Sequence, residues 1–178
     1  MYRSSFRTAV RRLPFALFIL GACDAPSTTA PELAPALSRR APQFEQQIAA
    51  CPTTRSYRAE RTLGPRGGSI SAGHHRLTVP RGVLTEPTRF TLYAPAGQEV
   101  KIELSANGES HYEFAAPVAV TISYERCARQ HLPPTPMTAW YVDDAGTRFL
   151  ERMGGRDDRI RKTVTFRTTH FSTYLVAY

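Results

Sequence analysis

Residues 118–124 read Val-Ala-Val-Thr-Ile-Ser-Tyr, and this stretch decides the fold class. Large apolar side chains occupy every second position, and small or polar residues lie between them. Successive side chains of a β-strand point to opposite faces of a sheet. The alternation therefore predicts a strand with one face in a core and the other in solvent.

The same alternation recurs on both sides of this stretch, at residues 77–79, 100–104 and 164–166. Turn signals separate the runs. Asn107-Gly108 predicts a tight turn between the strand that ends near Leu104 and the strand that carries Phe114. Residues 143–146, Asp-Asp-Ala-Gly, predict a second turn between residues 139–142 and 147–150.

Residues 51–178 alternate short runs of β-branched and aromatic residues with Gly, Pro and Asn. About eight to ten short strands without intervening helices predict an all-β fold, a single antiparallel β-sandwich. The segment has 128 residues, which suits one domain with one hydrophobic core.

Residues 1–22 have the order of a signal peptide. Arginines without any acidic residue precede the apolar run Leu13-Pro-Phe-Ala-Leu-Phe-Ile-Leu20. The run is much shorter than the roughly 20 apolar residues of a membrane-spanning helix, which disfavours a permanent span. Arg11-Arg12 also suggests a twin-arginine signal, but the residues after the pair fit that motif poorly.

The run ends in Leu20-Gly21-Ala22-Cys23, which resembles the lipobox of bacterial lipoproteins. In that family the cysteine sulfur takes a diacylglycerol, the chain is cut before the cysteine, and the new amine is usually acylated. The resemblance implies a covalent lipid on Cys23, and we expect no other cofactor. The alternative is an ordinary cleaved signal peptide with an incidental cysteine.

Several acyl chains would hold the protein durably on membrane lipid, because one chain alone gives only reversible binding. We therefore expect a bacterial cell-envelope protein on the periplasmic face or the cell surface; Asp24 resembles an inner-membrane retention signal but leaves the membrane open. Residues 23–50 are rich in Pro, Ala, Ser and Thr and predict a disordered tether, with one short helical turn over 44–50.

The formal net charge of +8 falls to +4 once the four arginines of the signal peptide are removed. The remaining charges are spread along the chain without a basic stripe, so we expect no nucleic-acid partner. Of the three cysteines, Cys51 and Cys127 remain after Cys23 is assigned to the lipid. An even pair in an oxidising compartment favours a disulfide over two free thiols.

Four motifs stand out between residues 63 and 178: Gly67-Gly68-Ser69-Ile70, Leu77 to Leu84, Phe114-Ala-Ala-Pro117-Val118 and Lys162 to Tyr174. Together, in this order, they resemble the ZU-five family, a β-sandwich domain of tight-junction scaffolds, netrin receptors, ankyrins and bacterial surface proteins. The proline-rich loop 130–136 and the two spare cysteines depart from that pattern. The glycines allow a positive-φ turn, and Pro80 ends its strand because it cannot donate to a ladder.

The resemblance also implies one possible activity, at His170-Phe171-Ser172. Some members of this fold family cleave themselves at such a sequence: the serine hydroxyl attacks the preceding carbonyl and the histidine helps to move the proton. The alternative is structural, with a packed Phe171 and a hydrogen-bonded His170.

Other chemistry has little support. His74, His75, His111, His131 and His170 lack the spacing of a zinc motif, the paired aspartates suit turns better than calcium, and common hydrolase signatures are absent, so we expect no metal and no enzyme. The leading hypothesis is a lipid-anchored, non-catalytic β-sandwich that binds an envelope protein or glycan or has a structural role. The rivals are self-cleavage between Phe171 and Ser172 and an envelope hydrolase with a cryptic site.

Overall fold

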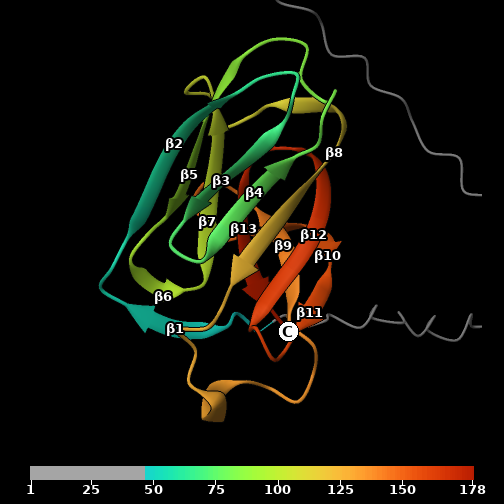
Figure 1. Cartoon of the computed structure of the whole chain (residues 1–178). Helices are drawn as coiled ribbons and strands as arrows, with labels where there is room; N and C mark the ends of the chain where they lie inside the picture. The colour runs from blue at the N-terminus through green and yellow to red at the C-terminus, as the bar shows by residue number, and fades with distance from the viewer. Residues whose placement is uncertain (1–46) are drawn as a thin grey trace, which may run out of the picture. The chain divides into compact units, whose positions relative to one another are not determined.

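The computed structural model describes residues 47–178, which form a two-layered antiparallel β-sandwich (Figure 1). This confirms the predicted fold class. The predicted signal peptide, Cys23 and the predicted tether up to residue 46 lie outside the described residues. Within residues 47–178, no helix is long and apolar enough to cross a membrane.

Thirteen strands and one short 3₁₀ helix make up this domain, more strands than the sequence suggested because several are only three or four residues long. The strands are β1 (Ala50–Thr53), β2 (Tyr57–Leu63), β3 (Gly68–Ala72), β4 (His75–Val79), β5 (Thr88–Ala94), β6 (Gly97–Glu99), β7 (Lys101–Ala106), β8 (Glu113–Ser123), β9 (Thr138–Val142), β10 (Phe149–Gly154), β11 (Arg156–Asp158), β12 (Thr163–His170) and β13 (Thr173–Ala177), and the helix is η1 (Arg129–His131).

The six-stranded sheet has the order β10-β9-β13-β7-β5-β2, and the five-stranded sheet has the order β11-β12-β8-β4-β3. Strands β1 and β6 form a separate antiparallel pair. Neighbours in each sheet are mostly distant in sequence, and β13, the last strand, lies in the middle of the larger sheet between β9 and β7.

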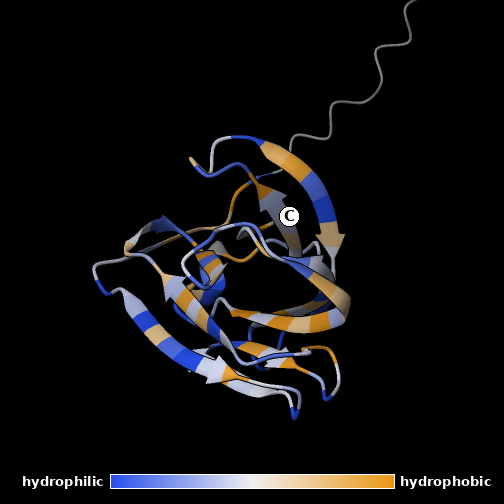
Figure 2. Cartoon of the chain, turned by 90° about the horizontal axis from the view of Figure 1, so that it is seen from above, coloured by the Kyte–Doolittle hydropathy of each residue, from blue (hydrophilic) through white to orange (hydrophobic). Residues whose placement is uncertain are grey.

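The predicted alternation fills the space between the sheets. Val118, Val120 and Ile122 of β8 are fully buried, and Val120 lies opposite Leu77 of β4 and Phe166 of β12. Figure 2 shows the resulting alternation of apolar and polar residues along the strands. Each large side chain buried in this way contributes about 1.5–3 kcal/mol to folding.

The predicted turns are present, with one correction. Asn107 and Gly108 have positive φ angles of 54° and 90°, as a tight hairpin turn requires, and Ala106 bridges Glu109. The strands before and after this turn do not pair, however. Strand β7 belongs to the six-stranded sheet and β8 to the five-stranded one, so the chain crosses between layers after the turn.

The outer face of the six-stranded sheet carries a second apolar cluster, formed by Val142, Leu175 and Ala177 and covered by Ile48, Trp140 and Phe149. Ile48 bridges Ala177, and Gln47 exchanges two backbone hydrogen bonds with Tyr178. Residues 47–50 are therefore extended, and the predicted helical turn is wrong for this part. Pairing with the last strand satisfies their backbone groups instead.

Candidate functional sites

A groove of about 290 Å³ lies on the polar part of the outer face of the six-stranded sheet. Strands β2, β5 and β7 form its floor, and Asp144 from the β9–β10 turn lies at its rim. Antiparallel pairing places Arg58 opposite Tyr93 and Tyr93 opposite Glu103, so outward side chains from three strands meet there.

The side chains of this groove can both donate and accept hydrogen bonds around one half-buried aromatic ring. Tyr93 supplies the ring, Thr91 and Ser105 supply hydroxyls from paired positions, and Glu103 and Asp144 supply carboxylates. Arg58 is held by Glu60, at 2.7 Å from Nη2 to Oε1. That hydrogen bond keeps the pKa of Glu60 below its usual value. The groove thus carries two carboxylates and one guanidinium that is already paired with Glu60.

Sequence reasoning did not find this groove. Of its three strands only β7 had been predicted, from the alternation at residues 100–104, whereas β2 and β5 had not been recognised as strands. Outward polar residues normally face solvent and carry no signal of their own. Only the register of β2, β5 and β7 brings them together.

The segment His170-Phe171-Ser172 carries the chain from β12 in one sheet to β13 in the other. Phe171 is buried and makes edge-to-face contacts with Phe114 and Phe90, with ring centroids 4.7 and 5.5 Å away. Its N–H donates to the carbonyl of Tyr112 at 2.8 Å. Ser172 is also buried, and its Oγ has no hydrogen-bond partner among the described residues.

The ring of His170 points toward a cluster of other side chains. Its Nε2 lies 3.6 Å from an Oε of Glu151 and its Nδ1 lies 3.4 Å from the hydroxyl of Tyr174. That hydroxyl donates to the His170 carbonyl at 2.6 Å. Within residues 47–178, no hydrogen bond joins His170 to Ser172. His170 and Ser172 are close in sequence, but they do not form the nucleophile–base contact that self-cleavage needs.

The two adjacent histidines point to opposite sides, as expected for neighbouring residues entering a strand. His74 is exposed, with Nδ1 3.4 Å from Oε2 of Glu125. His75 is buried, and its Nδ1 accepts the N–H of Ser123 at 3.3 Å. Burial, assisted by the nearby Arg126, lowers the pKa of His75 to about 4. No group of three or more potential metal ligands occurs in the described part of the chain.

Asp143 and Asp144 lie in the β9–β10 turn, whereas Asp157 and Asp158 end strand β11, directly before its turn, and Asp157 has an additional role. Asp143 and Asp158 accept backbone N–H groups of their own turns. Asp157 instead has a nearly buried side chain that accepts hydrogen bonds from Tyr124 and from the backbone N–H of Met137. This role has no local signature, because the two partners of Asp157 lie 33 and 20 residues away along the chain.

The predicted disulfide is present. Cys51 of β1 and Cys127 after β8 are bonded across 76 residues, with their Cα atoms 4.9 Å apart, and both are buried. It fixes the segment where the chain enters the sandwich to the loop that precedes η1. Cys23, predicted to carry the lipid, lies outside the described residues.

No family model matches the chain, and no curated protein matches it either.

Proposed function

We propose that this protein is a lipid-anchored binding module of the bacterial cell envelope, tethered through Cys23 and binding its ligand in the groove around Tyr93. The groove carries the binding proposal, since it combines an aromatic ring with side chains that donate and accept hydrogen bonds. Leu20-Gly21-Ala22-Cys23, the proline-rich segment after it and a disulfide suited to an oxidising compartment support the anchored location.

The chemistry of the groove fits a glycan. A sugar offers vicinal hydroxyls, which pair with carboxylates and hydroxyls, and a face of C–H groups, which packs on an aromatic ring. Two carboxylates beside one guanidinium, Arg58, do not suit a polyanion. The volume lies near the lower end for ligand sites, about 300 Å³, so the groove fits a short stretch of such a chain.

Binding is tested by isothermal titration of the mature protein with chitotetraose and with soluble peptidoglycan fragments. Tyr93→Ala should weaken the binding of the active probe at least about tenfold, a loss of about 1.4 kcal/mol. Tyr57→Ala is the matched control, because Tyr57 is an exposed tyrosine of β2 outside the groove. Equal affinity of Tyr93→Ala and wild type, or no binding of either probe by wild type, would reject the glycan groove.

The anchor is tested separately by replacing its sulfur. Cys23→Ala should leave an uncut precursor or a soluble protein, and the mature wild type should carry the mass of its acyl chains. An ordinary signal peptide would instead be cleaved in the Cys23→Ala variant as in wild type. Fractionation and mass spectrometry of the mature N-terminus separate the two.

A second candidate function is self-cleavage between Phe171 and Ser172, and the buried, unpartnered hydroxyl of Ser172 is the observation that favours it. In this reaction Oγ attacks the Phe171 carbonyl carbon, its proton passes to a base, and the C–N bond breaks to give an ester and a free Ser172 amine. Water then hydrolyses the ester to a Phe171 carboxylate and restores the hydroxyl. His170 would have to turn toward Ser172 to carry the proton.

Intact-mass analysis after long incubation decides this candidate. Cleavage predicts a new fragment comprising residues 172–178, lost in Ser172→Ala and slowed in His170→Ala. A single uncut species in wild type would rule it out and would leave the binding module unaffected.

A further inference from the structure

Ile160 is the most exposed large apolar residue of the described chain. It lies in the turn between β11 and β12 with 95 % of its surface open to solvent, against 43 % for Leu150 and 37 % for Tyr57. An isolated apolar side chain on a surface is ordinary. Ile160, however, is held outward by a turn whose backbone is fixed by hydrogen bonds.

The turn is fixed by its own side chains. Asp158 accepts the backbone N–H groups of Ile160 and Arg161, at 3.1 and 2.9 Å, and also the Arg161 guanidinium. Lys162 has a positive φ of 51°, and its ammonium donates to the carbonyl of Cys127 at 2.7 Å. The apex is therefore tied both to itself and to the disulfide loop.

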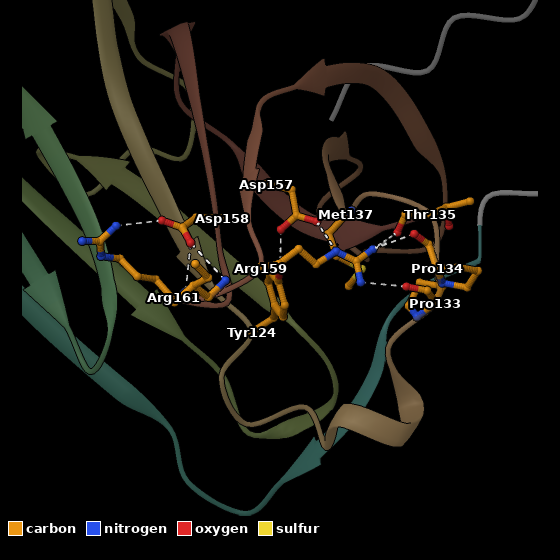
Figure 3. A network of polar contacts seen from close by, with 10 residues as sticks. Tyr124, Pro133, Pro134, Thr135, Met137, Asp157, Asp158, Arg159 and Arg161 are labelled. Atoms are coloured by element: carbon orange, nitrogen blue, oxygen red, sulfur yellow. Dashed lines mark hydrogen bonds and ion pairs between the residues drawn. The ribbon is translucent and has the colours of Figure 1, made fainter.

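A second set of contacts clamps the turn to the proline-rich loop, as Figure 3 shows. Arg159 donates to the carbonyls of Pro133, at 2.8 Å, and of its two successors. Its Nε also lies 3.0 Å from the nearly buried carboxylate of Asp157. Asp157 in turn accepts the N–H of Met137. The side chains of Asp157 and Arg159, which precede Ile160, thereby hold the turn against the proline-rich loop.

This turn lies at the end of the sandwich where the tether enters. Met137, which bonds Asp157, precedes Thr138, and Thr138 pairs with Ala177 of β13. The next residue, Tyr178, exchanges hydrogen bonds with Gln47, the first residue that the structure describes. In Figure 1 the C-terminus accordingly lies beside β11.

The same end carries an excess of positive charge. Residues 125–129 and 156–162 contain six cations and three carboxylates, namely Arg126, Arg129, Arg156, Arg159, Arg161 and Lys162 against Glu125, Asp157 and Asp158. Arg126 is half-buried with its guanidinium on the carbonyl of Glu99, and Asp157 is nearly buried, so five cations and two carboxylates remain for the surface that a partner would meet. A cationic surface around one apolar apex fits the headgroup region of an anionic bilayer.

We infer that the β11–β12 turn contacts anionic phospholipid, with Ile160 entering the interfacial region of the membrane to which Cys23 anchors the chain. One side chain alone would bind a bilayer weakly. A lipid tether makes the contact intramolecular and raises the effective concentration of the surface. The contact would orient the domain, with this end against the membrane. This inference rests on the proposed anchor.

Fluorescence quenching by brominated lipids tests the contact. Ile160→Trp is placed in the mature, full-length protein, reconstituted in phosphatidylethanolamine vesicles containing brominated phosphatidylglycerol. Because Ile160 is almost fully exposed, the variant should fold. Leu150→Trp, at an exposed apolar residue outside the turn, is the matched control. The fluorescence of native Trp140, measured in the wild type, is subtracted from that of each variant. We expect the remaining fluorescence to be quenched at least about twofold more for Ile160→Trp than for Leu150→Trp.

Equal quenching of the two variants would overturn the inference. The state of Cys23 is measured on the same samples by mass spectrometry, so failure of the anchor is recognised separately. If Cys23 proves unmodified, greater quenching of Ile160→Trp with added vesicles still supports the lipid contact, and equal quenching still rejects it.

Discussion

The buried imidazole of His75 makes the stability of the fold depend on pH. Burial lowers its pKa to about 4 in the folded protein from the ordinary value of 6.5. Between these values the unfolded chain binds a proton and the folded protein does not. Stability is therefore full above about pH 6.5 and falls as the pH is lowered toward 4, by a total on the order of 3 kcal/mol.

Urea denaturation at pH 7.5 and pH 4.5 checks this expectation with two variants. His75→Asn retains an acceptor for the N–H of Ser123 without a titrating ring, so its loss of stability between the two pH values should be about 2 kcal/mol smaller than in wild type. His74→Asn should retain the wild-type loss, because His74 is exposed. Equal behaviour of the two variants would contradict the assignment to His75.

Replacing Ser172 should increase the stability of the fold, whereas most substitutions in a core decrease it. Its buried hydroxyl has no partner among the described residues, so folding strips it of water without replacing the hydrogen bond. Ser172→Ala should raise the free energy of unfolding by about 1 kcal/mol. Ser123→Ala is the control and should lower it by about 1 kcal/mol, because that buried hydroxyl accepts the N–H of Glu125. A loss of stability in Ser172→Ala would show that its hydroxyl has a partner.

At the scale of elements, two turn glycines distinguish the cost of a left-handed backbone conformation from the cost of a steric clash. Gly67 has φ of +70°, and an added Cβ would lie 2.4 Å from the carbonyl oxygen of Val79. Gly82 has φ of +83° but open space around its Cα. Gly82→Ala should cost about 1 kcal/mol for the left-handed conformation alone. Gly67→Ala should cost about 3 kcal/mol because backbone must also move.

Thermal and urea unfolding of these two variants measure the difference. Both should keep the β-sheet circular dichroism of wild type while folded. Similar losses for the two alanines would mean that the turn before β3 moves away from Val79 at little cost, in contradiction to the packing described.

The strands themselves could be predicted because alternation is a local property: Val118, Val120 and Ile122 reveal a buried face by themselves. Sheet membership could not. The turn at Asn107 reads as a hairpin, yet β7 pairs with β5 and β13, and β8 pairs with β4 and β12. The burial of Leu175 could not be predicted either. Its side chain lies on the outer face of the sheet and is covered only by residues of other strands and by Ile48.

At the scale of the whole molecule, the disulfide could be predicted from the sequence, whereas the groove around Tyr93 and the role of Asp157 could not. Cys51 and Cys127 could be paired from their number and compartment, without geometry. The groove around Tyr93 depends on the register of three strands and on a distant turn, and the role of Asp157 depends on the proline-rich loop. Neither leaves a pattern along the chain.

The disulfide yields the prediction that belongs to the whole domain. It closes a loop of 76 residues between the first strand and the end of β8. Such a constraint lowers the entropy of the unfolded chain and stabilises the fold by about 4 kcal/mol in the chain-entropy model. Reduction, or the double variant Cys51→Ala with Cys127→Ala, should lower the urea midpoint accordingly and leave the strand content intact, because the main core lies between the two sheets.

If reduction left the midpoint unchanged, the bond would have to constrain a segment already ordered in the unfolded chain. If reduction abolished the fold, the sheets would depend on this one link between β1 and the loop after β8.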